Sequence, residues 1–398
     1  MEAHTPELPA QSCPLAQWVP EHGGYWRVDR YRDVRKVLAD ASRFSSMAAE
    51  IPRLNSADFV PPIPFDLDPP HHGEVRRVLD ALLPRAVTDQ LEPAVRASAR
   101  TTAARLSAQA EFELMDDFAV PLVASGMWHL IGFREPDELS FIDQSKDLMR
   151  RMRDPSGTAH WGRDTTHVDT AGIPATPPGP PHSEQQSPPV LEQHILHAIQ
   201  HGLGNQQGLL SALSRAEWRT YFTDRETEIL GIIVGLTGTA LANTVNVLVS
   251  AVDHLGTYPE DRLKLLNHRD QVASAVEEML RLYPPQSPGR IAVRDTHLGG
   301  GQFRVGDSVL ASVLGANRDS EVFVNPGNLV LDRPWNPHLA FGVGRHRCVG
   351  ASFARMVIAV ALDELHAVIP HYRISGRSAP VGDSPLRAPW KRLWVEPV

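Results

Sequence analysis

Cysteine is scarce in this sequence, and basic residues nowhere form a block. Its 398 residues include two cysteines, Cys13 and Cys348, which lie far apart and belong to no pairing motif. This excludes a disulfide-rich secreted scaffold, and because no charged-then-apolar leader opens the chain we expect a reducing, cytoplasmic location. A net charge of −8 without a Lys/Arg block excludes nucleic acid and an anionic membrane surface as the main partner, so small molecules and proteins remain.

One long uncharged apolar run, from Ile229 to Val252, is long enough to span a bilayer. The run also contains threonines and asparagines, is flanked by Glu228 and Asp253, and lacks the aromatic belts of a membrane span. We therefore expect no membrane contact and a helix buried along the centre of a large soluble protein.

The hydrophobic periodicity predicts a fold that is mainly α with a minor β part. A short strand near Trp26 precedes a helix through Val34 and Leu38. The other predicted segments are helical blocks at 76–132, 136–153 and 190–282, short strands within 290–330, and a last helix after Gly350.

The segment 155–189 is rich in Pro, Gly, Ser, Thr and His and has little apolar periodicity, which predicts a long mobile loop. Helical spacing resumes at Val190 without a change in composition. We therefore expect a single domain over residues 1–398, with this loop as an insertion.

The densest chemical signal is FGVGRHRCVG at residues 341–350, directly before an amphipathic run from Ser352 to Leu365. A thiol at a helix N-terminus is expected to have a lowered pKa, and glycines let a backbone approach a flat macrocycle. A lone cysteine at such a place is more often a buried hydrophobic residue than a ligand. The complete string at 341–350 therefore has to distinguish these two interpretations.

That string resembles the haem-ligand loop of cytochromes P450, Phe-Gly-x-Gly-x-His-x-Cys-x-Gly, at every defined position. The resemblance extends over nearly the whole chain and implies the cytochrome P450 fold with haem b as cofactor. It implies Cys348 as the axial iron ligand, with Phe341, Gly342 and Gly350 in the loop that cradles the haem.

A second motif, Glu278-x-x-Arg281, places opposite charges on one helix face. A surface ion pair of this kind is common and contributes little. The motif also resembles the family's Glu-x-x-Arg helix, 70 residues before Cys348, and Arg333 stands where the family has a further arginine. The resemblance implies a buried network of these three residues.

Haem carries two propionates that need cationic or donor partners. The segment DPPHHGEVRR at 68–77 is similar to the family's Asp-Pro-Pro-Glu-His segment, which implies His72 and Arg76 as two of these partners. Arg290 and His346 stand at the other positions implied. Each of these four residues, taken alone, would be interpreted as a solvent-exposed charged side chain without a ligand.

The chain departs from the family in the long central helix, where members that activate O₂ carry an acid followed by an alcohol. Two registers are conceivable; the one that aligns 239–246 gives the family's separation of 35 residues from Asn243 to Glu278. In this register Ala242 replaces the acid and Asn243 the alcohol. Asn243 could hold water, and Thr244 could substitute in part, whereas Ala242 can do neither.

Position within the family pattern places a small-molecule substrate against four residues, Gly238, Thr239, Gln286 and Ser287, and against the turn 386–390. Arg345 and Arg347 flank the ligand cysteine, and a local basic patch on an acidic protein suits an acidic ferredoxin. Solvation alone would also account for these two arginines.

These observations favour a P450 monooxygenase-type oxidoreductase that performs oxidative tailoring in secondary metabolism. The altered central helix leaves open haem chemistry without O₂ cleavage, such as peroxide use, dehydration, rearrangement, cyclisation or nitrene-like group transfer. A haem sensor or carrier would explain Cys348 and the missing acid, but not a substrate lid as large as the 155–189 insertion.

Overall fold

The structure is a computed structural model. It describes residues 16–47, 49, 63–134, 137–153, 190–202, 204, 208–215, 218, 221, 225–378 and 392–398. The predicted loop at 155–189, the predicted pocket turn at 386–390 and Cys13 lie outside the described residues.

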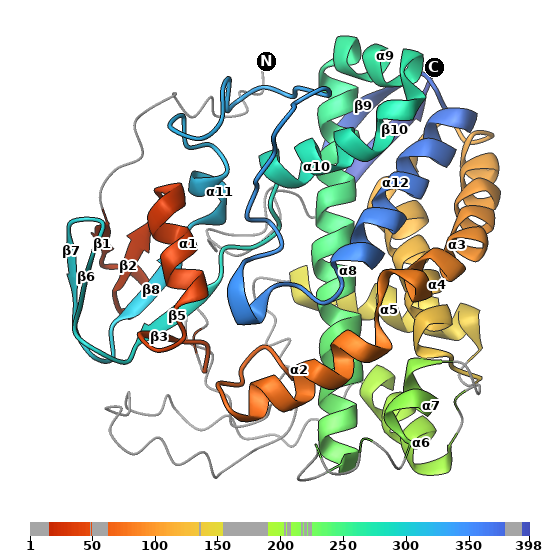
Figure 1. The fold of residues 1–398 in the computed structure, drawn as a ribbon. Helices are drawn as coiled ribbons and strands as arrows, with labels where there is room; N and C mark the ends of the chain where they lie inside the picture. Colours follow the sequence, from red (N-terminus) through yellow and green to blue (C-terminus); the bar gives the residue numbers. More distant parts are fainter. Residues whose placement is uncertain are drawn as a thin grey trace.

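Helices make up most of the described chain, which confirms the predicted mainly α fold (Figure 1). They are α1 (Tyr31–Ala39), α2 (His71–Leu82), α3 (Arg85–Leu106), α4 (Val120–Ile131), α5 (Glu138–Arg153), α6 (Val190–His201), α7 (Leu209–Leu213), α8 (Arg225–Thr257), α9 (Pro259–Asn267), α10 (Val272–Leu282), α11 (Val313–Ala316) and α12 (Ala351–Val368), with a π-helix at Met115–Ala119 and 3₁₀ turns at Glu21–Gly23, Arg269–Gln271 and Gly344–His346.

The strands form two small sheets and a hairpin. They are β1 (Gln17–Val19), β2 (Tyr25–Val28), β3 (Phe44–Ser45), β4 (Phe112–Glu113), β5 (Gly289–Ala292), β6 (Thr296–Leu298), β7 (Gly301–Phe303), β8 (Ser308–Ala311), β9 (Tyr372–Arg377) and β10 (Leu393–Pro397). The sheet orders are β1-β2-β8-β5-β3 and β4-β10-β9, and β6 pairs with β7. Only the β2–β8 pairing is parallel among the described ladders.

The structure differs from the sequence prediction at several points, because β3 lies in a predicted loop and β4 interrupts the predicted helical block 76–132. Helix α2 begins at His71, five residues earlier than predicted, because Pro70 can occupy its N-cap, where no N–H is needed. The strands predicted within 290–330 end at Ala311, and the rest of that segment forms α11 and turns.

Helix α8 runs through the centre of the helical part, as predicted for the long apolar run (Figure 1). Within Glu226–Thr257 it is the one described helix long and apolar enough to cross a membrane, and 72% of its most apolar window is buried inside the molecule. Glu226 and Glu228 in its first turn favour the positive end of the helix dipole. Its composition is therefore that of a core helix.

The helices and the larger sheet form separate hydrophobic cores. The helical core gathers residues of α2–α5, α8, α10 and α12, whereas the sheet core is built from α1, β2, β8 and neighbouring residues. Helix α10 ends at Leu282, directly before Pro284 and Pro285. In Figure 1 the loop that enters α12 lies between the two cores, so both cores position it.

Candidate active site

The loop at 341–350 is held by its own backbone hydrogen bonds. The amide of Cys348 donates to the carbonyl of Phe341 at 2.8 Å, and the amide of Gly342 donates to Leu339 at 2.8 Å. Gly344 has a φ of 79°, and a Cβ there would lie 2.9 Å from the Cα of Ala39. Glycine is therefore required where the loop crosses α1.

The pKa of the Cys348 thiol is raised, which contradicts the lowered value predicted from its place before a helix. Burial is the main cause, and it outweighs the opposing effects of the Gly350 amide and of Arg76, Arg355 and Arg347. Cys348 is a free cysteine. A metal ion at the sulfur would reverse this shift, because a coordinated thiol loses its proton.

Below this loop, Glu278 and Arg281 are fully buried and form a bidentate ion pair with distances of 2.7 and 2.9 Å. Arg333 donates to Glu278 at 2.8 Å, and Asn336 and the amide of Val330 add bonds of 3.0 and 2.9 Å. Burial alone would raise the pKa of Glu278, but these donors outweigh it and lower the pKa. The carboxylate is thereby kept ionised inside the core.

A second carboxylate network, which the sequence analysis missed, lies beside the first. Glu277 accepts from Arg355 at 2.6 and 2.8 Å and from His338 Nε2 at 3.0 Å. Burial opposes its ionisation, but the hydrogen bonds from Arg355 and His338 lower its pKa to about 2. Arg355 lies over the ring of Phe341, 4.3 Å from its centroid.

Of the four residues predicted to bind propionates, His72 and Arg290 are buried, and Arg76 and His346 are partly exposed. The rings of His72 and His346 lie 4.0 Å apart, and the Nε2 atom of each is buried without a hydrogen-bond partner among the described residues. Burial, followed by the neighbouring His72 and cations including Arg290 and Arg76, lowers the pKa of His346 to about 3. The two buried Nε2 atoms therefore lack a hydrogen-bond acceptor or donor among the described residues.

The two arginines of this group differ in their partners. Arg290 is almost fully buried, donates to the carbonyl of Gly289 at 2.6 Å, and has no carboxylate within ion-pair distance in the described part of the chain. Burial lowers the pKa of Arg290 to about 10. Arg76 pairs with Asp80 at 2.7 Å and also donates to the carbonyl of Arg347, next to Cys348.

His71 stands where the family pattern has a glutamate, and its role was not predicted. Its Nδ1 lies 3.2 Å from Glu74 and its Nε2 lies 3.1 Å from Glu228 at the start of α8. Each ring nitrogen therefore lies within hydrogen-bond distance of a carboxylate oxygen. This residue links α2, which carries His72 and Arg76, to α8.

The residues predicted to replace the family's acid and alcohol, together with Thr244, lie along one stretch of α8. Ala242 and Asn243 are partly exposed, and Asn243 makes no side-chain hydrogen bond to another described residue. Thr244 is buried. Among the predicted substrate residues Gly238 is buried, and the Thr239 hydroxyl donates to the carbonyl of Gly235 at 2.7 Å.

The predicted pair after α10 has a different environment. Ser287 is buried and its hydroxyl accepts from the amide of Val313 at 3.0 Å, so its oxygen fixes the start of α11. Gln286 is exposed. The structure therefore gives Ser287 a structural bond, a role that its sequence position did not indicate.

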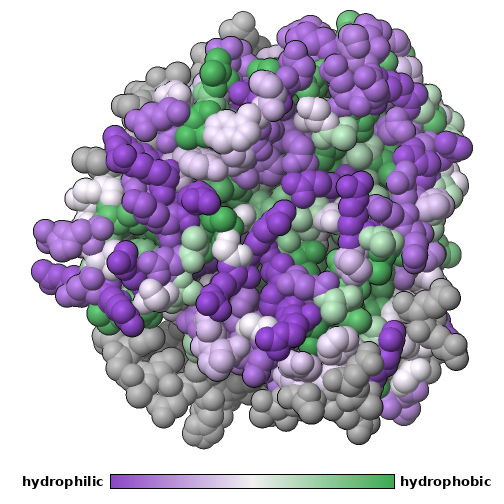
Figure 2. Space-filling view, in the orientation of Figure 1, coloured by the Kyte–Doolittle hydropathy of each residue, from purple (hydrophilic) through white to green (hydrophobic). Residues whose placement is uncertain are grey.

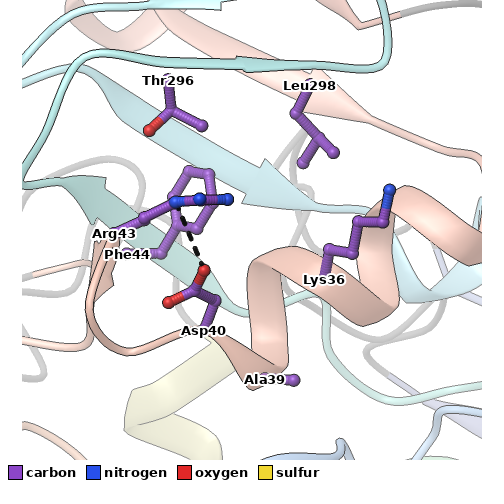
Figure 3. A pocket seen from close by; sticks show the side chains of 7 residues that line it. All are labelled: Lys36, Ala39, Asp40, Arg43, Phe44, Thr296 and Leu298. Atoms are coloured by element: carbon purple, nitrogen blue, oxygen red, sulfur yellow. Dashed lines mark ion pairs between the residues drawn. The ribbon is translucent and has the colours of Figure 1, made fainter.

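A separate cavity of about 270 Å³ lies between α1 and the β6–β7 hairpin (Figure 3). Thr296 and Leu298 face it from β6, and Asp40 and Arg43, 3.6 Å apart, from the segment after α1. It contains none of the predicted site residues.

Arg345 and Arg347 are both exposed on either side of His346. The face that carries this loop and α2 is mostly hydrophilic, with smaller apolar areas between the polar side chains (Figure 2). The charge needed to attract an acidic partner is therefore present at the surface beside Cys348.

Comparison with known proteins identifies the class. The model of the family described as Cytochrome P450 matches residues 253–375. The chain is 31% identical to nocardicin C N-oxygenase of Nocardia uniformis subsp. tsuyamanensis, over 97% of this chain and 90% of that protein. It is 30% identical to cytochrome P450 YjiB of Bacillus subtilis (strain 168), covering 88% and 83% respectively.

The solved structure of cytochrome P450 CYP109B1 from Bacillus subtilis superposes with a TM-score of 0.73 at 26% identity, covering 96% of this chain and 95% of that one. The chain belongs to the cytochrome P450 family. It is therefore a haem-dependent oxidoreductase of the P450 monooxygenase class.

Proposed function

We propose that this chain is a single-domain, cytoplasmic haem-thiolate enzyme that oxidises a small organic molecule in specialised metabolism. The observation that carries the haem site is the cluster of His72, His346 and Arg290: the Nε2 atoms of both histidines are buried without a hydrogen-bond partner, and Arg290 has no carboxylate within ion-pair distance among the described residues. Two propionates would supply the missing acceptors, as the family's cofactor requires.

In this assignment the chain's own residues have separate tasks. Cys348 Sγ ligates the iron, and Phe341, Gly342 and Gly350 shape the loop around it. His72, Arg76, Arg290 and His346 donate to the propionates, and Glu278, Arg281 and Arg333 lock the core beneath the loop. Bound haem b supplies an iron whose thiolate ligand donates electron density for cleavage of an O–O bond.

On α8, we assign Asn243 to the holding of water. Its Oδ1 can accept from a water molecule and its Nδ2 can donate to one, but neither atom titrates. Ala242 has no polar atom, so in this position the proton has to come through water rather than from a side chain. Thr244 is buried, and its hydroxyl is a second candidate for this water.

Substrate contact is assigned to Gly238 and Thr239 on α8, and to Gln286 and Ser287 after α10. Because the Thr239 hydroxyl donates to Gly235, its oxygen retains only acceptor capacity. A substrate that donates a hydrogen bond there fits best. The relative nocardicin C N-oxygenase is named for oxygenation at nitrogen of one compound, which supports a single small-molecule substrate for this chain.

The electron donor is proposed to be an acidic ferredoxin that meets Arg345 and Arg347. Both arginines are exposed beside the ligand loop, on a chain whose net charge is −8. A local patch of opposite charge steers such a partner more than it strengthens the final complex.

The test of the haem assignment is the spectrum of the reduced protein with carbon monoxide. Thiolate ligation predicts a band at about 450 nm, and Cys348→Ser is expected to abolish it. A band at about 420 nm in folded, active wild-type protein would contradict the assignment of Cys348.

One observation favours a second candidate function, O₂-independent chemistry on the same fold. Ala242 and Asn243 place no titratable group on α8 where O₂-activating members carry an acid. Turnover under anaerobic conditions separates the two. Product formed at an undiminished rate without O₂ favours this candidate, whereas label from ¹⁸O₂ in the product favours the oxygenase.

A further inference from the structure

Glu277 and Glu278 are neighbours on α10, but their carboxylates bind different parts of the molecule. Glu278 is bound by Arg281, Arg333 and the loop around Val330. Glu277 instead reaches Arg355 on α12 and His338, which precedes the ligand loop by three residues. The contacts of Glu277 therefore lead directly to the cysteine-ligand loop.

The hydrogen bonds fix the protonation of His338. Its Nδ1 accepts from the amide of Ala340 at 3.2 Å, so Nε2 carries the proton and donates to Glu277 at 3.0 Å. Its side chain is 3% exposed. The amide of Ala340 thus sets the tautomer of this nearly buried histidine, and Glu277 holds the orientation of its ring through Nε2.

Arg355 and His338 meet at the ring of Phe341. The guanidinium of Arg355 lies 4.3 Å from the ring centroid, and the ring of His338 lies 5.9 Å from it. The carbonyl of Phe341 in turn accepts the amide of Cys348 at 2.8 Å. An unbroken series of contacts therefore runs from Glu277 to the backbone of Cys348.

We propose that Glu277 is a positioning residue for the cysteine-ligand loop, which it stabilises by holding Arg355 and His338 against the ring of Phe341. The inference rests on the proposed role of Cys348 as the haem ligand. The competing explanation is a surface ion pair, since Glu277 and Arg355 are 30% and 35% exposed, and such pairs contribute little.

Helix α12 supplies a matched control. Glu364 lies nine residues beyond Arg355 on the same helix and accepts from Arg96 and Arg100, each at 2.8 Å. It ties α12 to α3, and its side chain makes no hydrogen bond to the ligand loop in the described part of the chain. Substitution of either glutamate removes an arginine–glutamate ion pair that involves α12. Only the substitution of Glu277 removes contacts that lead to Phe341.

The experiment measures how fast the holoenzyme loses its thiolate ligation. The reduced carbon monoxide complex is warmed to one temperature, and the decay of the band at about 450 nm into one at about 420 nm is followed. We expect Glu277→Gln and Arg355→Met each to accelerate this decay several-fold, and the double variant to decay no faster than the faster single variant. Glu364→Gln is expected to decay at the wild-type rate.

Unfolding midpoints from circular dichroism separate loop loosening from general destabilisation. The proposal is contradicted if Glu277→Gln accelerates the decay no more than Glu364→Gln does, or if the Glu277 and Arg355 effects add independently. Should Glu277→Gln fail to accumulate, Arg355→Lys replaces it under the same criteria. A wild-type enzyme without the band at about 450 nm would instead contradict the haem assignment itself.

Discussion

The ligand-loop side of the site, residues 341–350 with the networks of Glu277 and Glu278, differs from the distal stretch of α8, residues 238–246. On the ligand-loop side, each carboxylate accepts several hydrogen bonds from separate elements. On the distal stretch, Asn243 is partly exposed and makes no side-chain bond to another described residue.

This contrast explains where the chain follows its family and where it departs. A buried charge with several partners cannot change without leaving the others unpaired, which costs several kcal/mol. A partly exposed side chain without such partners carries no such penalty. Substitutions that change the reaction are therefore expected on α8 more than in the two carboxylate networks.

The largest effect is predicted for Glu278→Ala, which removes the central carboxylate of the Glu278 network on the ligand-loop side. Arg281 would remain buried without its carboxylate, at a cost of about 3–5 kcal/mol, so we expect little soluble, haem-loaded protein. Expression yield and haem content per chain measure the effect. Asp332→Asn, an exposed neighbour of Arg333, is the control and should behave as wild type. Normal haem content in Glu278→Ala would show that the network is dispensable.

The next prediction concerns pH and the donors for the propionates. In the haem-free chain the pKa of His346 is about 3, below its ordinary value of 6.5. Between these values the unfolded chain binds a proton that the folded chain refuses, so stability falls as the pH drops through this window. Propionates beside the ring favour its protonated form and raise its pKa, so the haem-loaded chain should lose less stability.

Urea midpoints of haem-free and haem-loaded protein at about pH 7.5, 6 and 5 test this prediction. His366, whose pKa burial lowers to about 4, changes both forms equally and cancels in the difference. His346→Gln should remove part of the pH dependence of that difference, because burial also lowers the pKa of His72, which is assigned to the same propionates. Parallel pH curves for the two wild-type forms would contradict the prediction.

The parts of the site that were predicted match motifs of the family. The loop around Cys348 is one continuous string and Glu278 and Arg281 share a helix face, whereas Arg333 and the four propionate residues, far apart in the chain, were implied by the resemblance alone. The contacts of Glu277 with His338 and Arg355 join residues 61 and 78 positions apart, and no periodicity indicates them. His71 and Glu228 are 157 positions apart.

Long-range pairing and depth of burial, which a local pattern does not show, also limited the prediction of the fold and of the Cys348 pKa. The helices were predicted from their apolar spacing, but β4 pairs with β10 at the far end of the chain, Phe112 opposite Val395, and two-residue strands have no pattern of their own. For Cys348, position before a helix indicates the dipole but not the depth of burial. Burial has the larger effect, so the predicted direction of its pKa shift was wrong.

A smaller effect is predicted on the distal stretch. Asn243→Ala removes an amide that can hold water, and the loss of one such hydrogen bond, about 1 kcal/mol, corresponds to roughly a fivefold to tenfold loss of product. Unproductive peroxide release should rise in parallel, and thermal stability should not change. Ala242→Asp with Asn243→Thr restores the acid and alcohol. If the native reaction needs no O₂, neither change should alter the native product yield.

The smallest effect is predicted for the exposed arginines beside the ligand loop, and it depends on salt. Arg345→Gln with Arg347→Gln should slow reduction by an acidic ferredoxin a few-fold at low ionic strength, because rim charges act mainly on the rate of association. The difference should vanish near 1 M salt, where the screening length falls to about 3 Å. Arg373→Gln is the control, because this exposed arginine lies on β9, outside the ligand loop, and pairs with Glu396. Equal slowing by this control would show that net charge, rather than a patch beside Cys348, governs the encounter. Unchanged rates in the double variant at low salt would show that the electron donor binds to another face of the enzyme. The ligand-loop side would then have haem binding as its only proposed role.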